Sequence, residues 1–170
     1  MKLIIILFLL STLSSCKTIK MNRESEKSIQ ISIYDLKNLS PNECLDVQNL
    51  FIFDTQKVII SPHAINDNII ERQEKYIEGL SNVSKFKNLK HLYFLNICMK
   101  DLPDVILSLE KLEELQFNFI DEFVIEKQVS KLIQFKKLKI LMLNQHFIGD
   151  EKFNLIKTRL AKSKIKVISS

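Results

Sequence analysis

A spacing of apolar residues that repeats along the second half of the chain constrains the fold more than any other sequence feature. Five apolar positions recur after 23 residues, and four of the five recur once more after a further 26 residues. The three copies are Phe86, Leu89, Leu92, Phe94 and Ile97; Leu109, Leu112, Leu115, Phe117 and Ile120; and Phe135, Leu138, Leu141 and Leu143. Periods of this length are typical of repeat architectures, in which similar units stack side by side.

The spacing within one copy predicts a short strand preceded by a turn. Leu92 and Phe94 are two residues apart, as are side chains on one face of a strand. One such unit cannot bury its own apolar side, so we expect the units to stack and join these sides into one core. A set of amphipathic helices is the alternative, because spacings of three and four residues also occur on one helix face. Three aligned copies with the same two-residue centre favour strands.

The hexapeptide at residues 89–94, LKHLYF, has the form LxxLxL and resembles the leucine-rich-repeat family. Residues 101–106, DLPDVI, resemble the turn that leads each repeat of this family back along its outer face. The resemblance covers roughly residues 44–167. It implies an α/β fold: a short leucine-rich-repeat solenoid, with a parallel β-sheet on the concave face and helices and turns on the convex face. The asparagine that usually closes the motif is replaced here by Ile97, Ile120 and His146.

Two patterns predict helices in the last third of the chain. A stripe of helical spacing predicts a helix that packs against the strands through Ile125, Val129, Leu132 and Ile133. We expect a second helix, capped by Asp150, to bury Phe153, Ile156 and Leu160. A final strand is expected at residues 165–167.

The segment before the three copies is predicted less regularly. Residues 47–52, with the pattern VxxLxI, fit the first strand of the array, and residues 29–45 are expected to form an N-terminal cap. In the longer stretch between that strand and Phe86, Ser61-Pro62 is a plausible helix start and Gly79 a plausible stop.

The N-terminus has the three parts of a secretory signal: Lys2, an apolar run over residues 3–10, and small polar residues that end at Cys16. The run is too short to span a bilayer, which takes roughly 20 apolar residues. Residues 13–16, LSSC, resemble the bacterial lipobox, which implies lipidation of Cys16 and cleavage before it. Two acyl chains are enough for stable anchoring in a membrane. A plain signal peptide, or a buried strand that ends in cysteine, is the alternative.

These features divide the chain into four expected parts. They are a lipoprotein signal peptide at 1–15, a lipidated cysteine and flexible tether at 16–28, an N-terminal cap with the first strand and a helical insertion at 29–85, and the repeats with a C-terminal cap at 86–170. The residues after Cys16, which begin Lys17-Thr18, carry neither an aspartate retention signal nor an acidic export cluster. By elimination, we expect the periplasmic face of an outer membrane in the bacterial cell envelope.

Composition and spacing argue against several chemical functions. The formal net charge of +5, which becomes +4 without Lys2, comes from lysines interleaved with apolar residues, as on the solvated rim of a repeat rather than in a nucleic-acid groove. Two glycines are too few for phosphate-binding loops, and the three histidines have no metal-ligand spacing. Adjacent acidic residues such as Glu113 and Glu114 are expected to point to opposite faces of a strand as solvated charges. We therefore expect no enzyme, cofactor, metal or small-molecule substrate.

Cys44 and Cys98 remain after the lipobox cysteine. An exported protein can hold disulfides, so these two thiols either form a bridge or stay free as small apolar side chains inside the domain.

The residues that flank the buried leucines are expected to face outward from the concave sheet as a contiguous, apolar contact surface. They are Asn49, Phe51 and Phe53; His91, Tyr93 and Leu95; Glu114, Gln116 and Asn118; and Ile140, Met142 and Asn144. Exposed apolar patches mark interaction sites. The sequence thus predicts a protein-binding module, an adaptor or recognition protein; a structural or assembly component of an envelope complex is the alternative. A register error of one residue would exchange the inner and outer faces.

Overall fold

The computed structural model describes residues 26–55, 67–120 and 122–170, with backbone only for residues 67–72. The signal peptide, the lipobox cysteine Cys16, the expected helix start at Ser61-Pro62 and the tether up to residue 25 lie outside the described residues.

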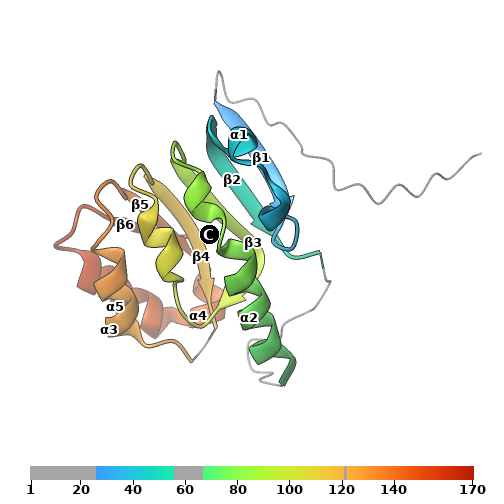
Figure 1. The fold of residues 1–170 in the computed structure, drawn as a ribbon. Helices are drawn as coiled ribbons and strands as arrows, with labels where there is room; N and C mark the ends of the chain where they lie inside the picture. Colours follow the sequence, from blue (N-terminus) through green and yellow to red (C-terminus); the bar gives the residue numbers. More distant parts are fainter. Residues whose placement is uncertain (1–25, 56–66, 121) are drawn as a thin grey trace, which may run out of the picture.

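The domain is built on a six-stranded parallel sheet whose strand order follows the order of the chain, β1-β2-β3-β4-β5-β6 (Figure 1). The strands are β1 (Lys27–Ser32), β2 (Val47–Phe53), β3 (His91–Met99), β4 (Glu114–Phe119), β5 (Ile140–Leu143) and β6 (Lys166–Ser169). Parallel neighbours need crossover connections. These are the helices α1 (Pro41–Cys44), α2 (Asp67–Leu80), α3 (Ile125–Leu132), α4 (Gln145–Ile148) and α5 (Asp150–Leu160) and the 3-10 turns η1 (Leu36–Asn38), η2 (Val83–Lys85) and η3 (Asp104–Ser108). The predicted α/β class with a parallel sheet is confirmed.

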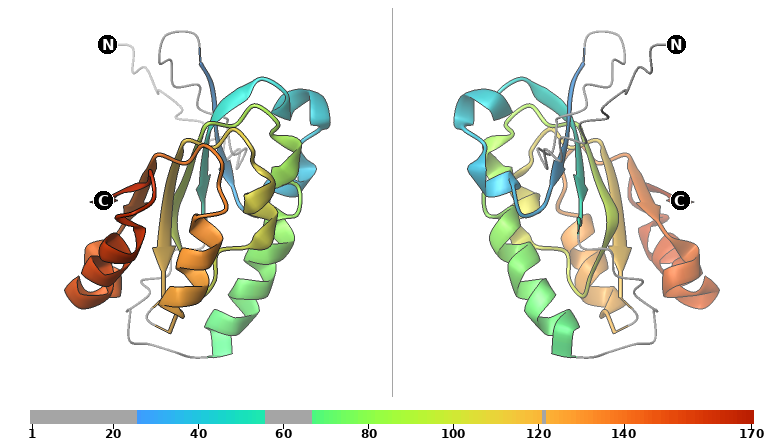
Figure 2. Two further views of the ribbon diagram at one scale, coloured as in Figure 1. Left: turned by 90° about the vertical axis from the view of Figure 1, so that its left-hand side faces the viewer. Right: turned by 90° about the vertical axis from the view of Figure 1, so that its right-hand side faces the viewer.

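The repeated apolar residues form the core on one face of this sheet. Hydrogen-bonded register places three of them side by side across neighbouring strands, and Leu50 and Val167 extend this row at either end: Leu50, Leu92, Leu115, Leu141 and Val167. All five are buried, and the Phe94 and Phe117 rings meet edge to face 5.4 Å apart in the next layer. Figure 2 shows α1 and α2 on this side of the sheet. Stacking therefore buries what no single unit could bury alone.

Helix α3 lies where the sequence predicted it, but its buried face differs. Leu132 is buried, whereas Ile133 follows the helix end and is 57% exposed, so its assignment to the core was wrong. The side chain at the core-facing position is instead Gln128, which is fully buried. Its Oε1 accepts from the Leu102 amide at 2.9 Å and its Nε2 donates to Asp101 Oδ1 at 2.5 Å. A buried amide is tolerated here because both of its ends are hydrogen-bonded.

Helix α5 buries Phe153, Ile156 and Leu160 as predicted. Its N-cap is Gly149, at φ 79°, and not Asp150 as the sequence analysis expected. Asp150 is the first helical residue, where its negative charge favours the helix N-terminus, and its Oδ1 accepts from Gln145 Nε2 at 2.8 Å.

Helix α2 ends at Leu80, one residue after Gly79, where the sequence predicted the helix to stop. A Cβ at Gly79 would lie 2.5 Å from the Ile33 carbonyl oxygen, so the glycine permits a close approach between the helix and the chain that follows β1. Nearby on α2, the buried Tyr76 donates from its hydroxyl to Asp54 Oδ2 at 2.5 Å.

The expected N-terminal cap contains a strand of the main sheet. β1 begins at Lys27, so the sheet takes in the last residues of the predicted tether, and Ile29 and Ile31 stand beside Leu50 and Ile52 of β2. The rest of the cap is η1 and α1, whose first turn is closed by a reciprocal Ser40 and Glu43 capping box.

Candidate functional site

The face of the sheet opposite the repeated leucines, here called the open face, carries side chains in rows that cross the strands. Its first row is Ser28, Asn49, His91, Glu114, Ile140 and Lys166, and its second row is Gln30, Phe51, Tyr93, Gln116, Met142 and Ile168. A shorter third row is Ser32, Phe53 and Leu95. Ten of the twelve predicted contact residues, all except Asn118 and Asn144, therefore lie on one face.

An aromatic pair occupies the middle of the second row. The rings of Phe51 and Tyr93 stack with centroids 4.7 Å apart and planes 12° apart, and both residues are half-buried. The Tyr93 hydroxyl donates to Glu114 Oε2 at 2.8 Å. The stack and this hydrogen bond restrict the rotation of Tyr93. The pair presents a fixed aromatic surface with one polar end, which is the kind of side chain enriched at protein interfaces.

A polar cluster lies beside this pair, where the strands begin. The Asn49 amide nitrogen donates to Ser28 Oγ at 3.0 Å and to Glu26 Oε2 at 3.3 Å, and Asn49 Oδ1 is hydrogen-bonded to His91 Nδ1. Glu26 Oε1 lies 3.3 Å from Lys90 Nζ. Asn49 is almost fully buried, so this network fixes the start of β1 against β2 and β3.

The electrostatics of the cluster favour an ionised Glu26. Burial opposes ionisation, but the hydrogen bond from Asn49 and the charge of Lys90 outweigh burial and hold the pKa of Glu26 below its ordinary value. At the neighbouring rim, the hydrogen bond from Lys139 lowers the pKa of Glu113. The Glu113 carboxylate thus pairs with Lys139 at the rim, whereas the Glu114 carboxylate accepts a hydrogen bond from Tyr93 on the open face.

Asn118, expected as a contact residue, is buried. The register between β3 and β4 shifts after Tyr93, and Asn96 adopts φ 57° within this irregular stretch. The Asn118 amide donates at 3.5 Å to the carbonyl oxygens of Phe94 and Ile97, which the irregularity leaves without regular ladder partners. Within the described residues its Oδ1 has no hydrogen-bond partner. The Asn118 side chain therefore donates hydrogen bonds to the irregular stretch of β3 and is not part of the contact surface.

Asn144 is also not a contact residue. It is the N-cap of α4, and its Oδ1 accepts from the amides of His146 and Phe147 at 3.0 and 3.3 Å. The preference of asparagine for N-caps was a signal that could have found this role. His146 is exposed on α4, apart from the His91 cluster, and the described ranges hold no group of three potential metal ligands.

Five residues of the open face and its cluster were missed by sequence reasoning. They are Glu26, Ser28, Gln30, Lys166 and Ile168. All five lie in or beside β1 and β6, outside the three repeat copies, where no repeat fixed the register. The alternation of Ile29, Ile31 and Ile33 was a signal for β1.

Cys44 and Cys98 are free thiols, so the disulfide that the sequence left open does not form. Both are buried, and burial raises the pKa of Cys98 to about 11. Such a thiol stays protonated at neutral pH and packs as a small apolar side chain.

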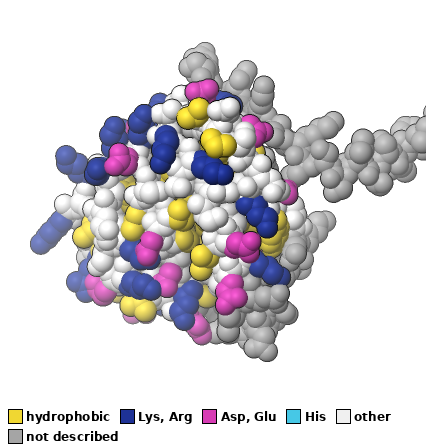
Figure 3. All heavy atoms as spheres, viewed as in Figure 1, with side chains coloured by type: hydrophobic (Ala, Val, Ile, Leu, Met, Phe, Trp, Pro, Cys, Tyr) yellow, Lys and Arg dark blue, Asp and Glu magenta, His cyan; other side chains and the backbone are white. Residues whose placement is uncertain are grey.

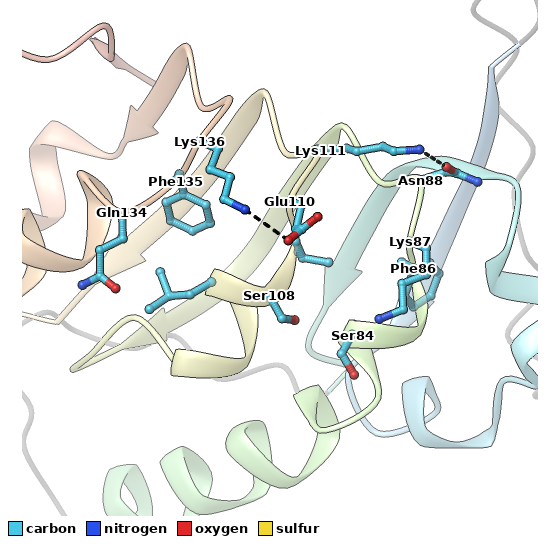
Figure 4. Close-up of a pocket in the computed structure, with 12 residues that line it drawn as sticks. Ser84, Phe86, Lys87, Asn88, Ser108, Glu110, Lys111, Gln134, Phe135 and Lys136 are labelled. Atoms are coloured by element: carbon cyan, nitrogen blue, oxygen red, sulfur yellow. Dashed lines mark hydrogen bonds and ion pairs between the residues drawn. The ribbon is translucent and has the colours of Figure 1, made fainter.

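The helix side of the molecule offers less specific chemistry. A cavity of about 510 Å³ lies between successive return turns (Figure 4). Its lining includes the first apolar residue of each of the three repeat copies, Phe86, Leu109 and Phe135. Its charged rim is internally paired, with Lys136 Nζ 3.3 Å from Glu110 Oε1. On the face that Figure 3 shows, acidic side chains lie among the lysines over most of the surface, and basic side chains predominate toward the upper left.

No protein-family model, no curated protein and no solved structure matches the chain. Within the described ranges, none of the helices combines the length and the apolar character that crossing a membrane requires.

Proposed function

We propose that this protein is a lipoprotein of the bacterial cell envelope whose leucine-rich-repeat domain binds another protein through the open face. The observation that carries the proposal is the second row of that face. There, the stacked Phe51 and Tyr93 continue through Gln116 into Met142 and Ile168 on neighbouring strands.

The agreement between strand order and chain order supports the leucine-rich-repeat interpretation. Each unit adds one parallel strand beside the previous one, and the DLPDVI stretch forms the expected turn, with Leu102 and Ile106 fully buried around η3. A solenoid of this kind exposes one extended sheet surface, on which successive units contribute one residue each to a row.

The composition of the open face supports a protein ligand. Aromatic and methionine side chains in the second row supply contact area, while the half-buried polar side chains of His91 and Gln116 supply hydrogen-bonding groups among them. Protein interfaces combine such an apolar centre with a polar border. The residues are half-buried by one another, which limits the side-chain entropy lost on binding.

The lipobox supports the proposed location. With Cys16 lipidated, the domain would be held at a membrane surface and meet partners that lie in the same envelope. Cys16→Ser removes the only thiol at the cleavage site, so we expect an unprocessed precursor that takes up no label from a clickable fatty acid. Label retained by this variant would contradict the lipoprotein assignment without bearing on the binding face.

Photo-cross-linking in the native envelope tests the binding face. A photoreactive residue placed at Tyr93 or Met142 should form a discrete cross-linked product, and the same residue placed at Lys127, on the exposed side of α3, should not. Products from Lys127 alone would move the site to the helix side. A stoichiometric partner that survives purification would indicate a permanent structural component, and exchange of the partner would indicate an adaptor.

A further inference from the structure

Among the strands that the structure describes, none pairs with the outer edge of β6, the last strand of the sheet. Lys166 and Ser170 donate their backbone N–H groups to Lys139 and Leu143, at 2.7 and 3.0 Å. In a parallel pair, alternate residues turn both backbone groups toward one neighbour. The N–H and C=O groups of Val167 and Ser169 therefore point away from β5, along the side of β6 where the sheet ends (Figure 1).

A groove runs along this edge between β6 and α5. It has a volume of about 530 Å³. One wall is a stripe on α5 with helical spacing, Phe153, Lys157 and Ala161, and the other is formed by residues 165–169. Val167 pairs with Leu141 and faces the same side as the buried leucines of the preceding strands, and Ile165, just before β6, also lines the groove; both are almost fully buried at its base. A further strand laid beside β6 would thus find both backbone partners and an apolar surface.

The charged side chains that line the groove, Lys157 and Lys166, are both positive, and the acidic Asp150 beside it is hydrogen-bonded to the lining residue Gln145. Four exposed lysines surround it or precede it in the turn that enters β6, and they are Lys157, Lys162, Lys164 and Lys166. None of their ammonium groups has an ion pair or hydrogen bond with another residue in the described part of the chain. By contrast, the nearby Arg159 is paired with Glu126 at 3.1 Å. A ligand with carboxylates would meet unneutralised charge at this edge.

We propose that the edge of β6 binds an extended acidic polypeptide segment as an added strand, independently of the open face. The segment would alternate apolar and acidic residues, because side chains of a strand alternate between faces. Its apolar residues would cover Phe153 and Val167 on the α5 side, and its acidic residues would lie beside Lys166 on the other side. Addition of a strand to a sheet edge is a general mode of peptide recognition.

A second copy of this chain does not fit the edge. Pairing of two β6 edges would bring Lys164 and Lys166 of both copies into one interface without any acidic partner from β6, and edge lysines oppose such pairing. The outer strand β1 contains Lys27 and no carboxylate, and the Glu26 carboxylate just before it is already paired with Lys90.

A synthetic peptide of about seven residues that alternates glutamate and valine, with blocked ends, tests the proposal on the detergent-purified full chain. We expect binding by calorimetry, and slowed hydrogen exchange at the Val167 and Ser169 amides in the complex. A peptide with lysine in place of glutamate should not bind. If the acidic peptide fails to bind, or binds without protecting these two amides, strand addition is wrong.

Two variants locate the interaction, each with a control. Lys166→Glu should weaken binding about tenfold, whereas Lys87→Glu, an exposed lysine on the far repeat, should leave binding unchanged. Ser169→Pro removes one outward N–H without touching the bonds to β5, and it should also weaken binding about tenfold. Tyr93→Ser should have no effect, which separates this site from the open face. Equal losses for both lysine variants would overturn the proposal, as would self-association with the same amides protected when no peptide is present.

Discussion

The two faces of the parallel sheet are formed by the same strands, but they differ in how much the residue type varies from one strand to the next. On the covered face, the same residue type recurs from strand to strand, as in Leu50, Leu92, Leu115 and Leu141. On the open face, the second row changes at each step, from Gln30 through Phe51, Tyr93, Gln116 and Met142 to Ile168. Side chains of the covered face pack against those of the neighbouring units, so their volumes must be similar from strand to strand. Side chains of the open face are not packed in this way, so their volumes can differ.

This difference indicates which residues determine the stability of the fold and which are free to determine what the sheet binds. A residue of the covered face contacts the units on both sides, so a change there affects the whole stack. A residue of the open face contacts its row neighbours and solvent, so its type is free to follow a ligand. Substitutions matched across the two faces of one strand should therefore separate folding from binding.

The largest effect is expected for Leu115→Ala in β4. Leu115 is fully buried between Leu92 and Leu141, and loss of its side chain leaves a cavity, so we expect destabilisation by roughly 2–5 kcal/mol. Gln116→Ala, the next residue on the open face, should change the free energy of unfolding by less than about 0.5 kcal/mol. Urea titration of both variants measures the difference. Equal losses would show that the two faces do not differ as described.

A smaller effect is expected at Gly79, where helix α2 approaches the chain after β1. The methyl group of Gly79→Ala would meet the Ile33 carbonyl oxygen, a backbone atom that cannot rotate away, and we expect a cost of about 1–3 kcal/mol. Gly149→Ala is a contrasting variant: nothing lies within 4 Å of its added Cβ, but φ 79° with ψ 154° is a conformation essentially restricted to glycine, which costs about 1–3 kcal/mol for an alanine. In thermal or urea unfolding, a Gly79→Ala variant that is as stable as wild type or more stable, as expected for an alanine in an unobstructed helix, would contradict the close approach.

The covered face was predictable from sequence and the open face only in part. The repeated spacing located β3, β4 and β5, because burial forces an apolar residue at every inward position. The grouping of Phe51, Tyr93 and Met142 followed from the same register. Asn118 escaped prediction, because the bulge at Asn96 depends on one positive φ angle that the apolar pattern does not encode. The burial of Gln128 was not predicted, because the hydrogen bonds that make it possible come from residues far away in the sequence, Asp101 and Leu102.

On the open face, the effect of substitution should fall on binding. Tyr93→Ser and Met142→Ser should each weaken the interaction with the cross-linked partner by about 1 kcal/mol or more, as truncation of interface anchors does. Lys127→Ser is the control on α3; its exposed ion pair with Asp101 contributes little to stability. Titration of the partner against each folded variant gives the affinities. Weakening by Lys127→Ser alone would place the contact on the helix side.

The smallest effect is expected from Glu26, at the border between the open face and the start of β1. Its pKa is lower in the folded chain than its ordinary value of 4.5, since Asn49 and Lys90 outweigh the opposing effect of burial. A carboxylate with a lowered pKa stabilises the fold above its ordinary pKa, and this contribution is lost as pH falls through the folded value. Wild type should therefore lose more stability than Glu26→Gln between pH 6 and pH 3, by a small margin, in urea titrations at each pH. Glu74→Gln, an exposed carboxylate of α2, is the control and should follow wild type. If Glu26→Gln also follows wild type, the polar cluster does not hold β1 to the sheet through this charge, and β1 is held by Ile29 and Ile31 on the covered face alone.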